Sequence, residues 1–191
     1  MLDVRDTTLD LLMSRVSTGA LKAPAPDAQA LQQIVAAGLR APEHGKLRPW
    51  RFIAISGDAK ARFVDLVIAA MQARDPDVAQ SELDRTRGKL SAPPMILALG
   101  VHITPAHKIP EIEQIQTVGA AAMNMLNAAH ALGYAGKWIT GPNAYDPAVS
   151  TALGLPPPHR LAGFLYLGTP DGPLPEVKRP AVADYLTEWA G

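Results

Sequence analysis

The stretch from Glu111 to Gly133, followed at once by a short apolar segment at 135–140, constrains the fold most. From residue 118 to residue 132 every side chain is apolar or absent except those of Asn124, Asn127 and His130. On a helix this spacing of three forms one narrow polar stripe and leaves the other faces apolar. The run is shorter than the roughly 20 apolar residues that cross a bilayer. The sequence therefore predicts a core helix that is buried nearly all round.

This predicted helix carries small side chains at Ala120, Ala121, Ala122, Ala128 and Ala129. Small side chains let a neighbouring backbone, or a second copy of the helix, pack closely against it. A chain of 191 residues has limited material to cover such a helix, so we expect part of its surface to meet a partner subunit. The alternative is a helix wrapped entirely by its own chain.

Composition excludes several classes of function. The 18 basic residues equal the 18 acidic ones, so no nucleic-acid partner is expected. The chain has no cysteine, which excludes disulfides, cysteine nucleophiles and thiolate metal sites. The N-terminus lacks an apolar run that ends in a cleavage site. We expect one soluble, cytoplasmic domain over residues 1–191, with no membrane partner.

Helical and extended patterns alternate along the chain. Helices are predicted at 3–14, 31–39, 59–74, 77–90, 111–133 and 146–153, and strands at 51–56, 95–101, 135–140 and 160–168. The run at 95–101, MILALGV, does not alternate, which indicates burial on both faces. The pattern predicts an α+β domain with three α-β-α layers around the central helix. The proline-rich tail from Thr169 has too little regular structure to fold alone, so we expect it to lie along another surface.

Three common nucleotide and hydrolase motifs are absent from the sequence. There is no GxGxxG after a predicted strand, no GxxxxGK[ST] and no GxSxG. Their absence argues against a Rossmann dehydrogenase, a P-loop nucleotide hydrolase and a serine hydrolase.

Two segments carry candidate binding residues. Arg15 and Ser17 follow the first predicted helix two residues apart, so a guanidinium and a hydroxyl could close on one phosphate; the alternative is a solvated helix end. A basic loop comes next, with Arg40, His44, Lys46, Arg48 and Arg51 around a Pro-Trp pair. Such a loop suits a ligand that is anionic at one end and aromatic at the other, or it is a surface loop whose Trp50 only packs.

Metal binding is not predicted. His102, His107, Glu111 and Glu113 lie near one another in the sequence, but their spacing matches no recognised ligand pattern. His130 on the central helix is interpreted as a hydrogen-bonded core histidine.

Four segments, in order, resemble the nitroreductase family. They are Arg15-Val-Ser17, the run APEHGKLRPWRF at 41–52, the alanine-rich helix leading into GKWITG at 136–141, and GFLYLGTP at 163–170. The likeness extends from about residue 4 to residue 170 and is greatest to a small, single-domain subgroup of NAD(P)H-dependent enzymes.

The resemblance implies a flavin mononucleotide (FMN) site at a homodimer interface, in a nitroreductase-like fold with a tail exchanged between the chains. It implies that Arg15, Val16 and Ser17 hold the phosphate end. Arg40 and His44 would reach the cofactor, His44 from the partner. The isoalloxazine ring would lie against the segment formed by Trp138, Ile139 and Thr140.

The implied function is hydride transfer from NAD(P)H to a nitroaromatic or quinone by a ping-pong mechanism, with the chemistry at flavin N5 and no catalytic side chain. A flavin-storage protein remains an alternative, as does a relative that dehalogenates its substrate or degrades flavin.

The sequence departs from the family pattern in its basic residues. Val16 and Gly19 stand where the family often has further basic residues. The positive charge expected near the flavin pyrimidine ring is therefore unassigned. Lys46 and Arg48 both replace uncharged residues of the family pattern, and either could supply that charge.

Overall fold

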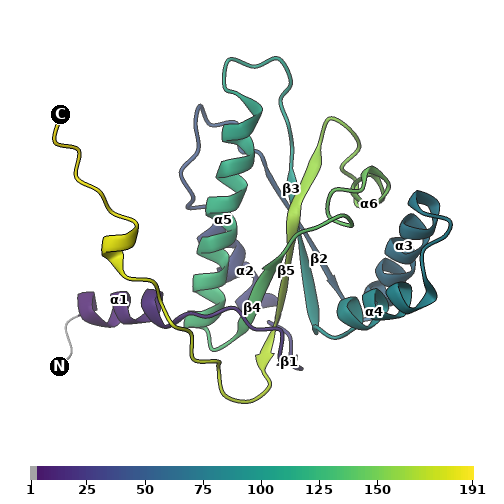
Figure 1. Cartoon of the computed structure of the whole chain (residues 1–191), viewed down its shortest axis with the longest axis horizontal. Coiled ribbons are helices and arrows are strands. Elements are labelled where there is room, and N and C mark those ends of the chain that lie inside the picture. Colours follow the sequence, from purple (N-terminus) through teal and green to yellow (C-terminus); the bar gives the residue numbers. More distant parts are fainter. Residues whose placement is uncertain (1–3) are drawn as a thin grey trace.

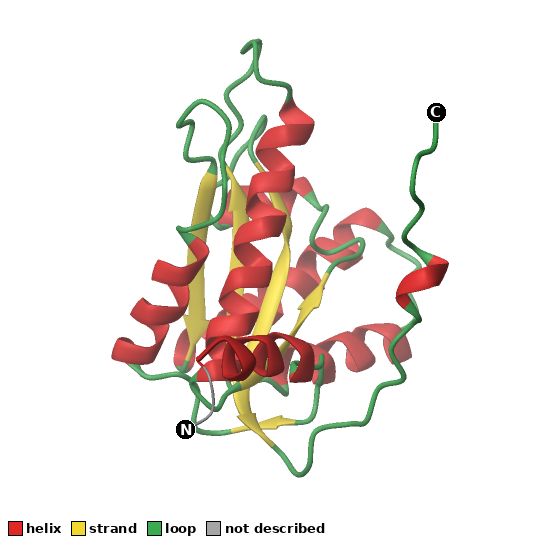
Figure 2. Ribbon diagram, turned by 90° about the vertical axis from the view of Figure 1, so that its left-hand side faces the viewer, coloured by secondary structure: helices red, strands yellow, loops and turns green. Residues whose placement is uncertain are grey.

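The computed structural model describes residues 4–191 as an α+β fold of three layers, which confirms the predicted fold class (Figures 1 and 2). The helices are α1 (Val4–Ser14), α2 (Ala28–Gly38), α3 (Asp58–Arg74), α4 (Gln80–Ser91), α5 (Glu111–Ala131), α6 (Pro147–Ala152) and the 3-10 turn η1 (Val182–Asp184). The strands are β1 (Leu21–Lys22), β2 (Trp50–Ser56), β3 (Met95–Val101), β4 (Ala135–Ile139) and β5 (Arg160–Pro170). Asp3, predicted to begin the first helix, lies outside the described residues.

The sheet is antiparallel at each of its strand pairs. Its order is β1-β5-β3-β2, and β4 pairs with β5 next to β1. All seven residues of β3 are buried, as the unbroken apolar run predicts. The register of β3 against β5 shifts between Leu99 and Gly100.

A separate apolar core lies on each face of the sheet, because alternate residues of the strands point to opposite faces. On one face α2 and α5 pack against β3 and β5, through residues such as Ile34, Val118, Met125, Leu97 and Leu165. On the other face α3 and α4 cover the sheet, through residues such as Phe63, Val67, Leu83, Ile96 and Phe164. Figure 1 shows the two helical layers to the left and right of the sheet.

Within one chain α5 is buried on one face only, so the prediction of burial nearly all round is wrong for a single chain. Val118, Ala122 and Met125 are fully buried against the sheet and α2. On the opposite face Ile112 is 57% exposed and Met123 is 43% exposed. The remaining chain does not extend over that face, which argues against a helix wrapped by its own chain.

Two elements differ from the sequence prediction near chain turns. α4 begins at Gln80 rather than at Asp77, because Asp77 and Val78 form a turn whose backbone N–H groups bond to Asp75. β1 was not predicted, since two residues carry no detectable pattern. The hydrogen bond predicted for His130 is present, because its Nε2 lies 3.0 Å from Ser14 Oγ, but the residue is half-buried rather than part of the core.

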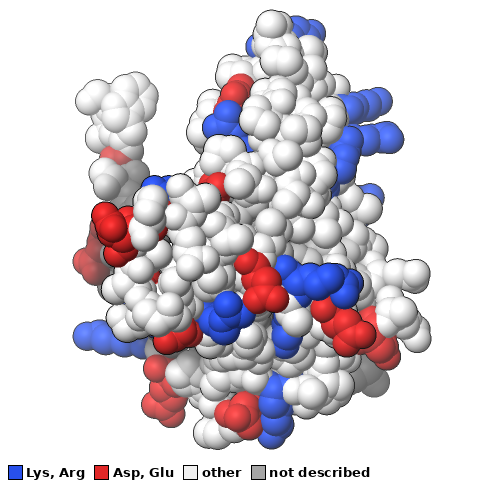
Figure 3. Space-filling model, turned by 90° about the vertical axis from the view of Figure 1, so that its right-hand side faces the viewer, with Lys and Arg blue, Asp and Glu red and all other residues white. Residues whose placement is uncertain are grey.

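The C-terminal tail stands away from the body of the protein in two perpendicular views (Figures 1 and 2). Its large apolar side chains, Val182, Tyr185, Leu186 and Trp189, are exposed, Trp189 to 91%. Acidic and basic groups intermingle over the lower part of the face shown in Figure 3. Within residues 4–191 no helix combines the length and apolarity that a membrane crossing requires.

Candidate functional site

The segment after α1 is fixed beside the start of β4. Ser17 forms a parallel bridge with Gly136, and the N–H of Thr18 donates to the Gly136 carbonyl at 3.2 Å. A Cβ on Gly136 would collide with the backbone carbonyl of Tyr166 on the paired strand β5, so the close approach of the two strands needs glycine here. The predicted phosphate segment and the predicted ring segment are therefore neighbours in space.

Arg15 presents hydrogen-bond donors that have no partner. Its Nε and Nη1 atoms are buried and unbonded in the described part of the chain, beside Val16, Leu126 and Leu174. Burial, and then the nearby charge of Arg179, lower the pKa of the Arg15 guanidinium. Arg179 itself donates through Nη2 to the Arg15 carbonyl at 2.6 Å. Two cations close together with orphaned donors suit an anion such as a phosphate.

The predicted ring segment ends β4, and its side chains alternate between the two faces. Trp138 is 41% exposed and lies against α5, since a Cβ on Gly119 would be 3.4 Å from the indole. Its Nε1–H donates to the Ala162 carbonyl at 3.1 Å. Ile139 packs against the core under α3, and Thr140 is exposed. The segment thus offers a flat, partly exposed surface next to Gly136.

His44 lies over the first half of α5. Its Nδ1 is 2.7 Å from Glu113 Oε2. An open groove of about 730 Å³ lies between the His44 loop and α5. It is lined by Pro42, Glu43, His44, Glu113, Gln116, Thr117 and Ala120. Arg40 is exposed just beyond α2. The groove borders the uncovered face of α5.

One chain does not bring all the predicted residues together. Arg15, Val16 and Ser17 meet the β4 segment through Gly136. No hydrogen bond or ion pair between described residues joins Arg40 or His44 to either segment. Sequence reasoning did not single out Arg179 or Lys137 as a site residue, although Lys137 stands within the segment at 136–141, because both come beside the segment after α1 only through tertiary contacts.

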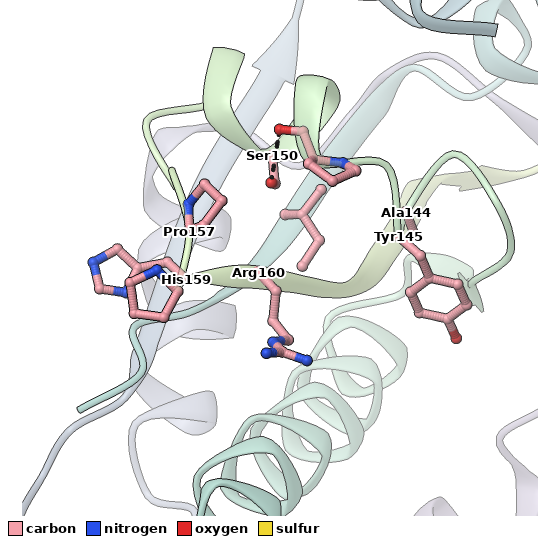
Figure 4. A pocket seen from close by; sticks show the side chains of 9 residues that line it. Ala144, Tyr145, Ser150, Pro157, His159 and Arg160 are labelled. Carbon is pink, nitrogen blue, oxygen red and sulfur yellow. Dashed lines mark hydrogen bonds between the residues drawn. The ribbon is translucent and has the colours of Figure 1, made fainter. Parts of the chain in front are cut away.

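A second cavity, of about 260 Å³, lies between α6 and the start of β5 and contains none of the predicted residues (Figure 4). Three of its polar side chains are already bonded. Ser150 Oγ donates to the Pro147 carbonyl at 3.2 Å, and Arg160 pairs with Glu111 at 2.8 Å. The Nδ1 of His159 accepts from the N–H of Ile103 at 3.2 Å. This cavity therefore lacks the orphaned donors that distinguish the surroundings of Arg15.

Metal ligands do not gather in the described residues. No group of three or more His, Cys, Asp or Glu side chains there is arranged to hold an ion.

The chain matches the model of the Nitroreductase family over residues 12–169. It is 38% identical over 163 residues to YdjA of Escherichia coli (strain K12), which is provisionally named an NAD(P)H nitroreductase. The match covers 85% of this chain and 87% of that protein.

Solved structures of low sequence identity share the fold. A nitroreductase-like protein of Bacillus cereus superposes with a TM-score of 0.84 at 18% identity, covering 100% of both chains. A provisionally named nitroreductase of Desulfovibrio desulfuricans, in complex with FMN, has a TM-score of 0.74 at 24% identity and 98% coverage of both chains. CinD of Lactococcus lactis, in complex with nicotinic acid, has a TM-score of 0.76 at 20% identity, covering 95% of this chain and 98% of that one.

Proposed function

This chain belongs to the nitroreductase family, and from that premise we propose that it is an FMN-dependent oxidoreductase that passes hydride from NAD(P)H to an electron-poor acceptor such as a nitroaromatic or a quinone. The observation that carries the proposal is the pair of buried, unpartnered donors of Arg15, Nε and Nη1, beside β4. Bound FMN would accept the hydride at N5 and release it to the acceptor. The protein then has to bind, orient and shield the ring rather than supply a catalytic side chain.

The residues around Gly136 fit a phosphorylated flavin. Arg15 offers two buried donors without partners, and Ser17 adds a hydroxyl on the same segment. These groups suit the phosphate, since charge-assisted hydrogen bonds from a guanidinium are stronger than hydrogen bonds between neutral groups. Val16 would line the same end. Trp138, Ile139 and Thr140 would lie against the ring, and the bond from Trp138 to Ala162 would keep the indole in place.

The active assembly in this proposal is a homodimer built on the uncovered face of α5. Ile112 and Met123 are exposed there beside small residues, Gly119 and Ala120. Burial of such a face is favourable by roughly 25 cal/mol per Å² of apolar surface. The groove with His44 borders this face, so a partner placed there would bring its own His44, and Arg40 nearby, towards the β4 segment of this chain.

The tail would complete the dimer by crossing to the partner. It leaves the body after β5 and carries exposed Val182, Tyr185, Leu186 and Trp189. A cluster of exposed apolar side chains like this one usually marks a segment that packs against another protein surface. An exchanged tail explains why the tail stands away from its own chain in both views.

Donor and acceptor are proposed to use one face of the ring in turn, by a ping-pong mechanism. The open groove beside His44 suits a flat ligand. The CinD neighbour binds nicotinic acid, a small aromatic molecule with an electron-poor ring. A nitroaromatic or a quinone likewise offers a flat, electron-poor ring.

Purification and anaerobic reduction test the proposal. The purified protein, supplied with FMN, should show the visible absorbance of oxidised flavin. Arg15→Ala should lose it, while Arg62→Ala on the exposed surface of α3 should keep it. NADH or NADPH should bleach the flavin without oxygen, and a nitroaromatic or quinone should restore the colour. A protein that stays colourless with excess FMN refutes the cofactor assignment. A coloured protein that neither nucleotide bleaches is a flavin store instead.

A further inference from the structure

Lys137 fills the space that a side chain at position 19 would occupy. A Cβ built on Gly19 would lie 2.5 Å from Lys137 Nζ and 3.1 Å from its Cε. No other residue has an atom among the three nearest to that position. The ammonium group therefore lies directly beside the segment that follows Ser17, although the two residues are far apart in the chain.

No ion pair within residues 4–191 neutralises the charge of Lys137. Its side chain is half-buried, and no carboxylate of the described residues lies within ion-pair distance. Its ammonium group instead lies over the ring of Tyr166, with Nζ 5.8 Å from the ring centroid. Burial raises the pKa of Tyr166 to about 12, so that ring is neutral at pH 7. By contrast, the exposed Lys22 pairs with Asp171 at 3.2 Å.

Lys137 also lies between the two segments assigned to the cofactor. Gly136, on one side, is bridged to Ser17, and Trp138, on the other, begins the ring segment. The Lys137 side chain leaves the face of β4 opposite to the Trp138 indole, but its ammonium group reaches the segment of Arg15 and Ser17 at Gly19. A flavin whose phosphate end meets that segment would therefore be bound close to this cation. Within one chain, Lys46 and Arg48 lie instead in the exposed loop with His44, where Glu43 accepts from the N–H of Arg48 at 2.5 Å. In the proposed dimer only the partner's copy of that loop would approach the ring.

We propose that Lys137 supplies the positive charge that stabilises the negative charge gained by the flavin ring on reduction, in place of a basic residue at position 19. A reduced flavin carries that charge at N1 and the C2 carbonyl, and a fixed cation nearby raises the reduction potential. This inference rests on the proposed function, because it needs bound FMN. It makes Lys137 a tuning residue rather than a phosphate ligand.

Sulfite titration and potentiometry of the FMN-loaded protein test this role. Sulfite adds to flavin N5 and pushes an electron pair towards N1 and the C2 carbonyl, so its affinity reports a cation there. Lys137→Met keeps roughly the length of the side chain and removes its positive charge. We expect it to stay yellow, to bind sulfite at least about tenfold more weakly, and to have a potential lower by about 30 mV, the two-electron equivalent of a tenfold change. Lys137→Arg should remain close to wild type.

A compensating variant separates charge from packing. Gly19 does not adopt a positive φ, so a side chain fits there once Lys137 is shortened or displaced. Gly19→Lys in the Lys137→Met background should restore both the sulfite affinity and the potential. If Lys137→Met holds too little flavin to titrate, the double variant decides, because it should recover flavin content and sulfite affinity together.

The matched control is Lys22→Met, which removes a cation that already has an acidic partner and should change neither quantity. Unchanged sulfite affinity and potential in yellow Lys137→Met overturn the inference but leave the proposed function standing. A colourless wild-type protein overturns the proposed function itself.

Discussion

Trp138 holds Gly163 in close contact across two paired strands. The indole Nε1 donates to the carbonyl of Ala162 at 3.1 Å, and the ring edge would collide with any Cβ on Gly163. Gly163 has a φ of +134°, which L side chains rarely adopt. The strand that carries the proposed ring segment is thus positioned by a glycine on its neighbour.

Gly163→Ala should destabilise the protein by about 3 kcal/mol or more. Strain at positive φ contributes about 1–3 kcal/mol, and the collision with Trp138 and the Ile139 carbonyl adds about 1–3 kcal/mol. Urea unfolding gives the difference in free energy. Gly172→Ala is the matched control, because Gly172 also has a positive φ but open space around it. Equal losses in the two variants would contradict the assigned role of the indole contact.

Stability should fall as the pH drops from about 7 towards 5 because of His159. Burial, then the charge of His102, whose ring stacks on it, and then the charge of Arg51 lower the pKa of His159 below 6.5. The unfolded chain therefore binds the proton at a higher pH than the folded chain does. The contribution of His159 is fully present above pH 6.5 and is lost as the pH falls through the folded pKa.

His159→Asn should flatten this pH dependence, since an amide oxygen can replace the Nδ1 acceptor for the Ile103 N–H without titrating. Thermal melts across the pH range measure the effect. His107→Asn replaces an Nδ1 that accepts a similar bond, from the Ile109 N–H at 3.1 Å, in an exposed loop. The idea fails if His107→Asn flattens the profile as much as His159→Asn.

Met123→Glu should break the proposed dimer. The substitution places a carboxylate on the uncovered face of α5, where burial without a partner is unfavourable by several kcal/mol. Sedimentation should then show monomers at concentrations where the wild type is dimeric, and FMN should be lost. Ala73→Glu on the exposed side of α3 should leave both properties unchanged. A dimeric Met123→Glu protein would rule out this face as the interface.

Removing residues 182–191 should weaken the dimer about tenfold or more without unfolding the subunit. The deleted segment exposes Val182, Tyr185, Leu186 and Trp189 in one chain, so its contacts are expected on the partner. Arg179 and its bond to the Arg15 carbonyl are retained. The dimer dissociation constant is the measurement, and Glu188→Gln in the full chain is the control. An unchanged constant would exclude an exchanged tail.

Much of the fold could be predicted from local patterns. The apolar run at 95–101 became the fully buried β3, and the alanine-rich stretch became α5. Hydrophobic periodicity and turn residues act over a few positions, so they can be detected in a single sequence. β1 escaped detection because two residues carry no period, and the start of α4 was missed because of a local side-chain turn at Asp75.

For the candidate site, the sequence by itself determined which side chains are available: Arg15 and Ser17 two residues apart, an aromatic end to β4, and a gap at Gly19 where a cation was expected. Tertiary structure alone decided that Ser17 bridges Gly136, that two Arg15 donors are left without partners, and that Lys137 lies beside Gly19. The physical reason is that composition and spacing specify chemistry along the chain. The pairing of β4 with β5, and of the segment after α1 with β4, decides which charged side chains from distant parts of the sequence lie together in one partly buried site.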